Sequence, residues 1–406
     1  MKYKEFREDA LAQLQSLPYE TNELYKKYSL SIELPSEQEL HKPTSESYTF
    51  INNVEKGIHT DFDVVISCDM VRSNSKIVKI IGMDELDKNL KNKLYKSNES
   101  KFVAFSNAHS SKALLIESNG KKENIKILFV NNGNLLMQTF VNTHDSDLNI
   151  TEFYLSNSKQ HSIMSSLHEF DVNNSTIEIN QIHNENENTT LLNLSKGVVN
   201  DNSTLNINSI YNGSTVTKSL SEFISNGSKS CARLNELAYG ISEQKFDLTT
   251  SITNSKQNSS AFLDSGVILD NNSYCALKGY AKIDKWTKNA KSKITERGIL
   301  LSKDAHIDAL PDMSIDYSDG VSATHSAATA PLDNDALFYM ESRGVGENDA
   351  RKMFISAFIS KHLSNINDPF ARELSSSIML NKLEYGYFGK PSEMTTKGVW
   401  STEKGE

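Results

Sequence analysis

A repeat of short strands and polar turns in the middle of the chain constrains the fold more than any other feature. Apolar pairs recur at positions 148/150, 177/179 and 205/207, at spacings of 29 and 28 residues. The turns between them are rich in Asn, Ser and Asp, which tolerate left-handed backbone and hydrogen-bond locally. Spacing of this size indicates stacked supersecondary units. One period can hold a strand, a turn, a second strand and a turn, which is one coil of a right-handed parallel β-helix.

The same strand-like character extends over residues 101–332, where short apolar alternations show no helical period. An antiparallel sandwich is the alternative, because its strands also recur regularly. The repetition of whole turn-plus-strand units favours the coil. We therefore expect a mainly β fold with a β-helix core at 101–332, an N-terminal helical and mixed part at 1–100, and a C-terminal helical part at 333–406.

Both ends of the chain have helical patterns. Phe6, Ala10, Leu14 and Leu17 recur at helical spacing and are followed by Pro18. In the C-terminal part we expect three helices, capped by Asp333 or Asn334, by Asn348, and by Asp368 before Pro369. The second should carry an apolar stripe of Ala350, Met353, Phe354, Ala357 and Phe358. The last coil of a β-solenoid needs a cap or a partner, and these helices can supply the cap.

Bulk properties exclude several classes of protein. A net charge of −9 over 406 residues argues against nucleic-acid and membrane partners. The N-terminus lacks the apolar core of a signal peptide, so we expect a cytoplasmic protein. Cys68, Cys231 and Cys275 are far apart and form no CxxC, so a disulfide framework or a cysteine-rich zinc site is not expected.

Two kinds of enzyme do not fit these features. A β-helix enzyme acting on polysaccharide would need paired carboxylates in a groove, and no such pairing can be recognised in 101–331. The chain also has no GxxxxGK[ST] loop, so it does not bind ATP in the P-loop manner. We therefore expect a chain that is not itself an enzyme.

Three segments in the last third resemble a known family. They are KGYAKI at 278–283, RGILLSKDAHIDALPDMSI at 297–315 and THSAATAPLDNDALFYMESRGVGENDARKMFISAF at 324–358. Their order and spacing are similar to those of the SufB/SufD family of iron–sulfur cluster assembly proteins. The resemblance implies a β-helix between two helical parts, a dimer with a SufB-type subunit or with a second copy, and C-terminal helices that dock a SufC-type ATPase.

Within that family the chain resembles SufD. SufB-type members carry an acceptor cysteine at about the position of Glu296, and a Glu directly after the motif histidine, where this chain has Ser326. The alternative is a SufB-like homodimer in a minimal system with the ATPase alone, with Cys231 or Cys275 as the first thiol to accept sulfur. The resemblance implies no tightly bound cofactor in this chain, a transient iron–sulfur cluster in the complex, and possible flavin binding by the complex.

His325 is the candidate metal ligand at the cluster-assembly interface. Neutral imidazole suits iron, and the small residues around it leave room for a cluster or a partner strand. A histidine that merely packs at the solenoid end is the structural alternative, and we treat His306 as structural. The candidates for ATPase docking are apolar and Arg side chains of the C-terminal helices: Phe338, Tyr339, Arg343, Met353, Phe354 and Phe358.

Overall fold

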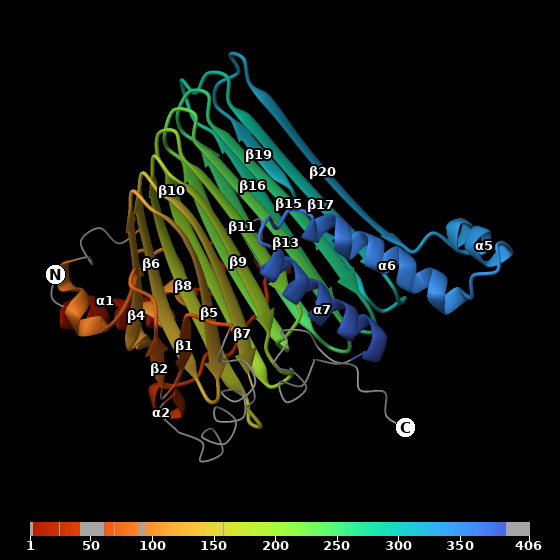
Figure 1. The fold of residues 1–406 in the computed structure, drawn as a ribbon, viewed down its shortest axis with the longest axis horizontal. Helices are drawn as coiled ribbons and strands as arrows, with labels where there is room; N and C mark the ends of the chain where they lie inside the picture. Colours follow the sequence, from red (N-terminus) through yellow and green to blue (C-terminus); the bar gives the residue numbers. More distant parts are fainter. Residues whose placement is uncertain are drawn as a thin grey trace.

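The computed structural model describes residues 3–23, 25–40, 61–68, 70–88, 94–156 and 158–386. Two long parallel sheets face each other and form a β-solenoid of about eight coils (Figure 1). Sheet A has the strand order β2-β1-β5-β7-β9-β11-β13-β15-β17-β20, and sheet B has the order β18-β16-β14-β12-β10-β8-β6-β4-β3, with β19 also on β16. From β4 to β18, consecutive strands therefore alternate between the sheets, as a coil requires.

The strands of sheet A are β1 (Val64–Ser67), β2 (Val71–Ser73), β5 (Lys122–Asn131), β7 (Asp147–Ser156), β9 (Thr176–Asn184), β11 (Thr204–Tyr211), β13 (Cys231–Gly240), β15 (Ser260–Leu269), β17 (Lys291–Leu300) and β20 (Ser322–Pro331). Those of sheet B are β3 (Val78–Gly82), β4 (Lys112–Asn119), β6 (Leu135–His144), β8 (Ser162–Asn173), β10 (Thr189–Val199), β12 (Val216–Ser225), β14 (Lys245–Asn254), β16 (Tyr274–Ile283), β18 (His306–Ala309) and β19 (Asp312–Ile315).

The sequence repeat corresponds to the coils. Leu148 and Ile150 pair in parallel with Ile177 and Ile179, and these pair with Leu205 and Ile207 on the next strand. The expected mainly β solenoid is confirmed, and the antiparallel sandwich is excluded. The second residue of each repeat belongs to one buried inner column, which we call the aliphatic column: Ile125, Ile150, Ile179, Ile207, Leu234, Leu263 and Ile294.

A left-handed residue begins every coil, two positions before a sheet A strand. The residues are Gly120, Asp145, Asn174, Asn202, Lys229, Asn258, Asn289 and Gly320, with φ between 44° and 69°. Asn, Asp and Gly reach this region at least cost, which explains the Asn-rich turns. In several turns the next residue is a buried serine whose hydroxyl donates to a carbonyl two or three residues earlier; Ser175 does so to Asn173 and Ser203 to Asp201. Asn-Ser pairs in this chain are therefore part of the coil geometry.

Helices cover the two outer faces of the solenoid. The N-terminal elements are α1 (Tyr3–Ser16), η1 (Lys26–Tyr28), α2 (Glu37–Leu40), η2 (Met83–Lys88) and α4 (Lys101–His109). Of these, α4 packs on sheet B through Phe102, Val103 and Phe105. On sheet A, α6 (Glu347–Leu363) and α7 (Pro369–Tyr385) cover the outer face, while α5 (Asn334–Ser342) lies beyond the β20 edge (Figure 1).

Two expectations about helices were wrong. Residues 101–109 form α4 although we expected strands throughout 101–331; every residue from 102 to 108 is buried, so no amphipathic period is visible. Helix α6 is capped by Gly346 instead of Asn348. The caps Asp333 and Asp368 are confirmed: Asp333 accepts from Asp335 N at 2.9 Å, and Asp368 accepts from Ala371 N at 3.3 Å. Parts of the 1–100 region and residues 387–406 lie outside the described residues.

Candidate functional site

His325 continues the aliphatic column. On β20 it pairs in parallel register with Ile294 of β17, which is fully buried in the inner core. Paired residues on neighbouring parallel strands point to the same face of a sheet. The aliphatic column therefore ends in an imidazole at the C-terminal end of the solenoid.

This end of the solenoid is open, so the expectation that the C-terminal helices cap the last coil is wrong: α6 and α7 pack on the outer face of sheet A instead. Among the described strands, β20 pairs only with β17, and nearly all of its residues are exposed, including His325. Within the described part of the chain, the His325 side chain takes part in no hydrogen bond or ion pair. An exposed imidazole among alanines, serines and threonines can bind a metal ion or a partner strand without first breaking a contact.

Glu296 lies on the inner face of β17, the strand that pairs with β20. It pairs with Ala327, two residues after His325, and its side chain is only 1% exposed. Burial, and then the nearby carboxyl of Glu236, raises the pKa of Glu296 to about 8. Glu296 Oε2 has no hydrogen-bond partner among the described residues. The strand next to β20 thus presents to the interior a buried carboxyl group whose raised pKa favours the protonated form at neutral pH.

Polar side chains also line the deeper interior. The carboxylate of Glu152 lies 3.0 Å from His168 Nε2 and accepts the Tyr154 hydroxyl at 2.8 Å. Burial raises the pKa of Glu152, but His168 and the hydrogen bonds outweigh burial and lower it overall. Gln181 donates to the same carboxylate at 3.3 Å. The interior at this level is a satisfied polar network instead of a purely apolar core.

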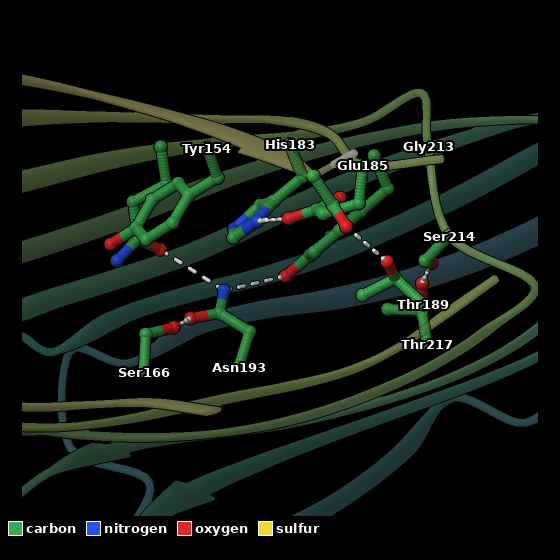
Figure 2. Close-up of polar contacts among 12 residues, drawn as sticks. Tyr154, Ser166, His183, Glu185, Thr189, Asn193, Gly213, Ser214 and Thr217 are labelled. Atoms are coloured by element: carbon green, nitrogen blue, oxygen red, sulfur yellow. Dashed lines mark hydrogen bonds and ion pairs between the residues drawn. The ribbon is translucent and has the colours of Figure 1, made fainter. Parts of the chain in front are cut away.

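A second buried pair, His183 and Glu185, lies beside Tyr154 inside the solenoid (Figure 2). His183 stacks between Tyr154 and Tyr211, with ring centroids 4.4 and 5.3 Å apart. Its Nδ1 lies 2.9 Å from Glu185 Oε1, and both residues are fully buried. None of these interior residues was predicted from the sequence. The available signal was the presence of Glu, Gln and His at inward positions of otherwise alternating strands.

Helix α6 docks on sheet A through an aliphatic face. The α6 side chains in the buried cluster are Ile355, Ile359 and Leu363, whereas Met353 is 53% exposed. Helix α6 has two apolar stripes, and the aliphatic stripe is the one that packs against sheet A. In the expected stripe, Ala350 is buried, Phe354 and Phe358 are partly buried, and Met353 and Ala357 are exposed.

The docking candidates divide into two groups. Phe338 and Tyr339 of α5 are 71% and 57% exposed, and Arg343 donates to the Tyr339 hydroxyl at 3.1 Å. With Met353 they form what we call the α5/α6 surface. Phe354 is half-buried, and Phe358 packs beside His362 with ring centroids 4.8 Å apart.

Polar contacts hold these helices in a defined position. Asn365 donates to Asn235 at the end of an asparagine ladder that runs through Asn208 and Asn180. Asp368 accepts the Thr151 hydroxyl at 2.9 Å. The segment that joins α6 to α7 is therefore held on the solenoid by an exposed amide contact at Asn365 and a buried contact at Asp368.

The cysteines and His306 lie outside β20. Cys231 and Cys275 are buried, and burial raises the pKa of both thiols. Cys68 is partly buried near the other end, where its thiol donates to the Asn134 carbonyl. His306 of β18 lies 3.1 Å from an Asp308 carboxylate oxygen and stacks on Tyr274.

Comparison with known proteins identifies a family and several relatives that this chain is similar to. Residues 132–358 match the family described as "SUF system FeS cluster assembly, SufBD core domain". The chain is 26% identical over 143 residues to the iron–sulfur cluster assembly protein SufD of Escherichia coli, covering 35% of this chain and 34% of that protein. It is 26% identical over 191 residues to a SufBD family protein of Synechocystis, covering 47% and 39%.

A SufBD family protein of Mycobacterium leprae is 35% identical over 77 residues, covering 19% of this chain and 20% of that protein. The aligned stretches thus span well under half the length of these relatives. No helix in the described ranges is long and apolar enough to cross a membrane. Because the family match spans more than half of the 406 residues and coincides with the solenoid and its first C-terminal helices, this chain belongs to the SufBD family of iron–sulfur cluster assembly proteins.

Proposed function

We propose that this chain is a non-catalytic, SufD-like scaffold subunit in the cytoplasm. It provides one side of the surface on which an iron–sulfur cluster is assembled, and it docks a SufC-type ATPase. The observation that carries the proposal is the position of His325, which faces inward at the open end of the solenoid, on a strand with a single neighbour among the described strands.

The edge of β20 supports a partner of the same fold. The strand has ten residues, carries no Lys, Arg, Asp or Glu, and has proline only at its last position. Long unprotected edges pair readily with another strand. We propose that a SufB-type subunit or a second copy of this chain pairs there, so that His325 becomes enclosed between two solenoids. The cluster is the cargo of this site, and the partner supplies its remaining ligands.

The α5/α6 surface supports the ATPase contact. Exposed aromatic and Met side chains beside an Arg are typical anchors for a protein partner. The surface lies next to β20, and the segment that follows the helix carrying Met353 is held on the solenoid by Asn365 and Asp368. A movement imposed on this surface by ATP-driven closure of the ATPase would therefore be transmitted to the solenoid end.

The buried thiols disfavour the SufB-like homodimer that uses Cys231 or Cys275 to accept sulfur. A thiolate is the reactive form of cysteine, and burial disfavours it. Burial raises the pKa of both thiols, and Cys275 is fully buried.

The test is anaerobic co-purification of the chain with a SufC-type ATPase and SufB. The variant is His325→Ala, and the matched control is Ser326→Ala, the next residue on the same exposed strand. We expect all three complexes to form, and only the His325→Ala complex to lack iron–sulfur absorption. Normal cluster content in His325→Ala would reduce His325 to packing at the solenoid end.

A separate binding measurement tests the docking surface. Met353→Asp should weaken ATPase binding at least tenfold, whereas Leu380→Asp, on an exposed part of α7, should leave it unchanged. Equal effects of the two substitutions would remove the α5/α6 surface from the proposal.

A further inference from the structure

Four rings stack along the inner face of sheet A. Phe129, Tyr154, His183 and Tyr211 occupy one register position on β5, β7, β9 and β11. Neighbouring rings have centroids 4.5, 4.4 and 5.3 Å apart, and their planes lie within 16° of parallel (Tyr154 and His183 in Figure 2). All four side chains are buried. The two tyrosines therefore have nearly the same packing, one on each side of His183.

The hydroxyl groups of the two tyrosines have different partners. The Tyr154 hydroxyl donates to Glu152 at 2.8 Å. The pKa of Glu152 is lowered overall, so this partner is an ionised carboxylate. The Tyr211 hydroxyl donates to Ser219 at 3.0 Å and accepts from Asn193 at 3.0 Å, and both of these partners are neutral. Among the described residues, Tyr154 therefore has a base at hydrogen-bond distance and Tyr211 has none.

We propose that Tyr154 is a redox-active tyrosine, which gives one electron to an oxidant and its phenolic proton to Glu152. The oxidant is a one-electron oxidant, such as a radical formed where ferrous iron meets peroxide, and it is reduced by that electron. The O–H bond of Tyr154 breaks, the proton crosses the 2.8 Å hydrogen bond to Glu152 Oε2, and a neutral tyrosyl radical remains. A thiolate later returns one electron and becomes a thiyl radical, while the proton moves back from Glu152 to Tyr154.

Burial explains why the carboxylate is needed. A tyrosine that loses an electron and keeps its proton carries a positive charge, and an unpaired charge in a protein core is strongly unfavourable. At Tyr154 the proton ends on Glu152, so the ring and the carboxyl group are both neutral after the reaction. Gln181 and His168 still hydrogen-bond the carboxyl group, so its oxygens keep their partners. At Tyr211 no described group takes the proton, so oxidation there is disfavoured.

The resting phenol keeps its proton. Burial, and then the Glu152 carboxylate, raises the pKa of Tyr154 well above that of a free phenol, so the proton leaves only together with the electron. The role that follows is protection, because an oxidising equivalent is held at a reversible site instead of oxidising methionine or cysteine. This role needs only a protein of iron–sulfur cluster assembly, and it does not depend on the SufD-like assignment.

The experiment is EPR spectroscopy of the full chain, oxidised by photogenerated ruthenium(III) tris-bipyridine and frozen after set delays. The chain has 15 tyrosines, and radicals on exposed rings meet and couple, so a long lifetime identifies a buried radical. We expect the wild-type tyrosyl signal to outlive that of Tyr154→Phe at least tenfold. The matched control is Tyr211→Phe, which removes a hydroxyl from another buried ring of the same stack and should keep the long-lived signal.

Glu152→Gln tests the proton acceptor. Its amide oxygen still accepts a hydrogen bond but takes up no proton, so the long-lived signal should be lost, while a melting curve checks that the variant folds. A second measurement needs no substitution. In the wild type, the rise of the tyrosyl signal should slow at least twofold in D2O, because a proton moves with the electron.

Ferrous iron with peroxide tests the protective role. Oxidation of methionine and cysteine, followed by mass spectrometry, should run at least twofold faster in Tyr154→Phe than in Tyr211→Phe, and equal rates would refute protection. A wild-type chain without a long-lived tyrosyl signal, equal loss of that signal in the two tyrosine variants, or an unchanged signal in Glu152→Gln would overturn the inference. Each of these results leaves the proposed function standing, because that function is tested by the cluster content of the His325→Ala complex.

Discussion

The His362 ring of α6 occupies the space that a side chain at Gly266 of β15 would need. A Cβ atom built at Gly266 would lie 2.4 Å from His362 Nε2. The absence of a side chain lets α6 approach the outer face of sheet A closely. Beneath the helix, Leu237 precedes Gly266 in the same column of the sheet, and both belong to the covered face. This glycine determines how deeply the C-terminal helices dock.

Gly266→Ala should therefore loosen the C-terminal helices. The added methyl group collides with a buried ring, and overpacking of this kind costs roughly 1–3 kcal/mol. Chemical denaturation should show the loss, and hydrogen exchange should place it in α6. Gly133→Ala is the control, because no atom lies within 4 Å of its Cβ position. Similar stabilities for the two variants would contradict the close approach at Gly266.

His362 should make the docking of α6 sensitive to acid. Burial lowers the pKa of His362; the Asp264 carboxylate opposes this shift, and the Arg297 guanidinium adds to it. The folded chain therefore holds a neutral ring, while the unfolded chain binds a proton below about pH 6.5. Stability is full above that pH and is lost as the pH falls towards the folded-state pKa.

Melting temperatures at pH 7.5 and 5.5 measure this effect. We expect a larger drop for the wild type than for His362→Leu, which cannot be protonated. Equal drops would mean that His362 does not titrate differently in the folded and unfolded chains.

Glu296 should have the opposite pH dependence. Burial and the Glu236 carboxyl raise the pKa of Glu296 to about 8, against 4.5 for an ordinary glutamate. The folded chain keeps the proton that the unfolded chain releases, so this contribution to stability is present below pH 4.5 and is lost as the pH rises to 8. A tenfold difference in proton affinity between the folded and unfolded chains corresponds to roughly 1.4 kcal/mol of stability.

Glu296→Gln keeps the shape of the side chain and removes the ionisation. The variant should gain stability relative to the wild type as the pH rises from 5 to 8.5, as measured by denaturant titration at each pH. A constant difference across this range would show that Glu296 titrates normally.

Asn208 should contribute more to stability than its neighbour Asn206. Asn208 is buried, donates to Asn180 Oδ1 at 2.8 Å and accepts from Asn235 Nδ2 at 2.8 Å. Asn208→Ala breaks both bonds and leaves the buried Asn180 oxygen and the half-buried Asn235 amide nitrogen unpaired, at a cost of about 2 kcal/mol or more. In Asn206 the side-chain oxygen has no partner among the described residues, so Asn206→Ala should cost much less. The midpoints of urea denaturation of the two variants measure this difference in stability. Equal midpoints would show that the asparagine ladder does not stabilise the solenoid.

The coil architecture could be predicted because it is local. The spacing of Ile150, Ile179 and Ile207 reports which residues stack, since each coil contacts mainly its neighbours. Capping by Asp333 and Asp368 was equally readable, because a cap depends on the backbone two or three positions ahead. Helix α4 escaped prediction because every residue from 102 to 108 is buried, which erases the periodic signal.

The candidate site was only partly predictable. The motif around His325 identified the residue, but its inward direction follows from the register with Ile294, which depends on how many residues each turn contains. The pairing of Glu152 with His168 and the docking of Asp368 on Thr151 join residues from different strands and from distant parts of the chain. No local pattern encodes such contacts.

Residue order was enough to predict the stacked coils, their polar turns and the three C-terminal helices, because these depend on spacing and on the conformational preferences of neighbouring residues. Packing in three dimensions selected the stripe of α6 that faces the sheet and the polar groups that meet inside the solenoid, and it left one edge of β20 unpaired among the described strands. These outcomes depend on the packing and register of whole elements, whose energies are sums over contacts between residues far apart in the chain.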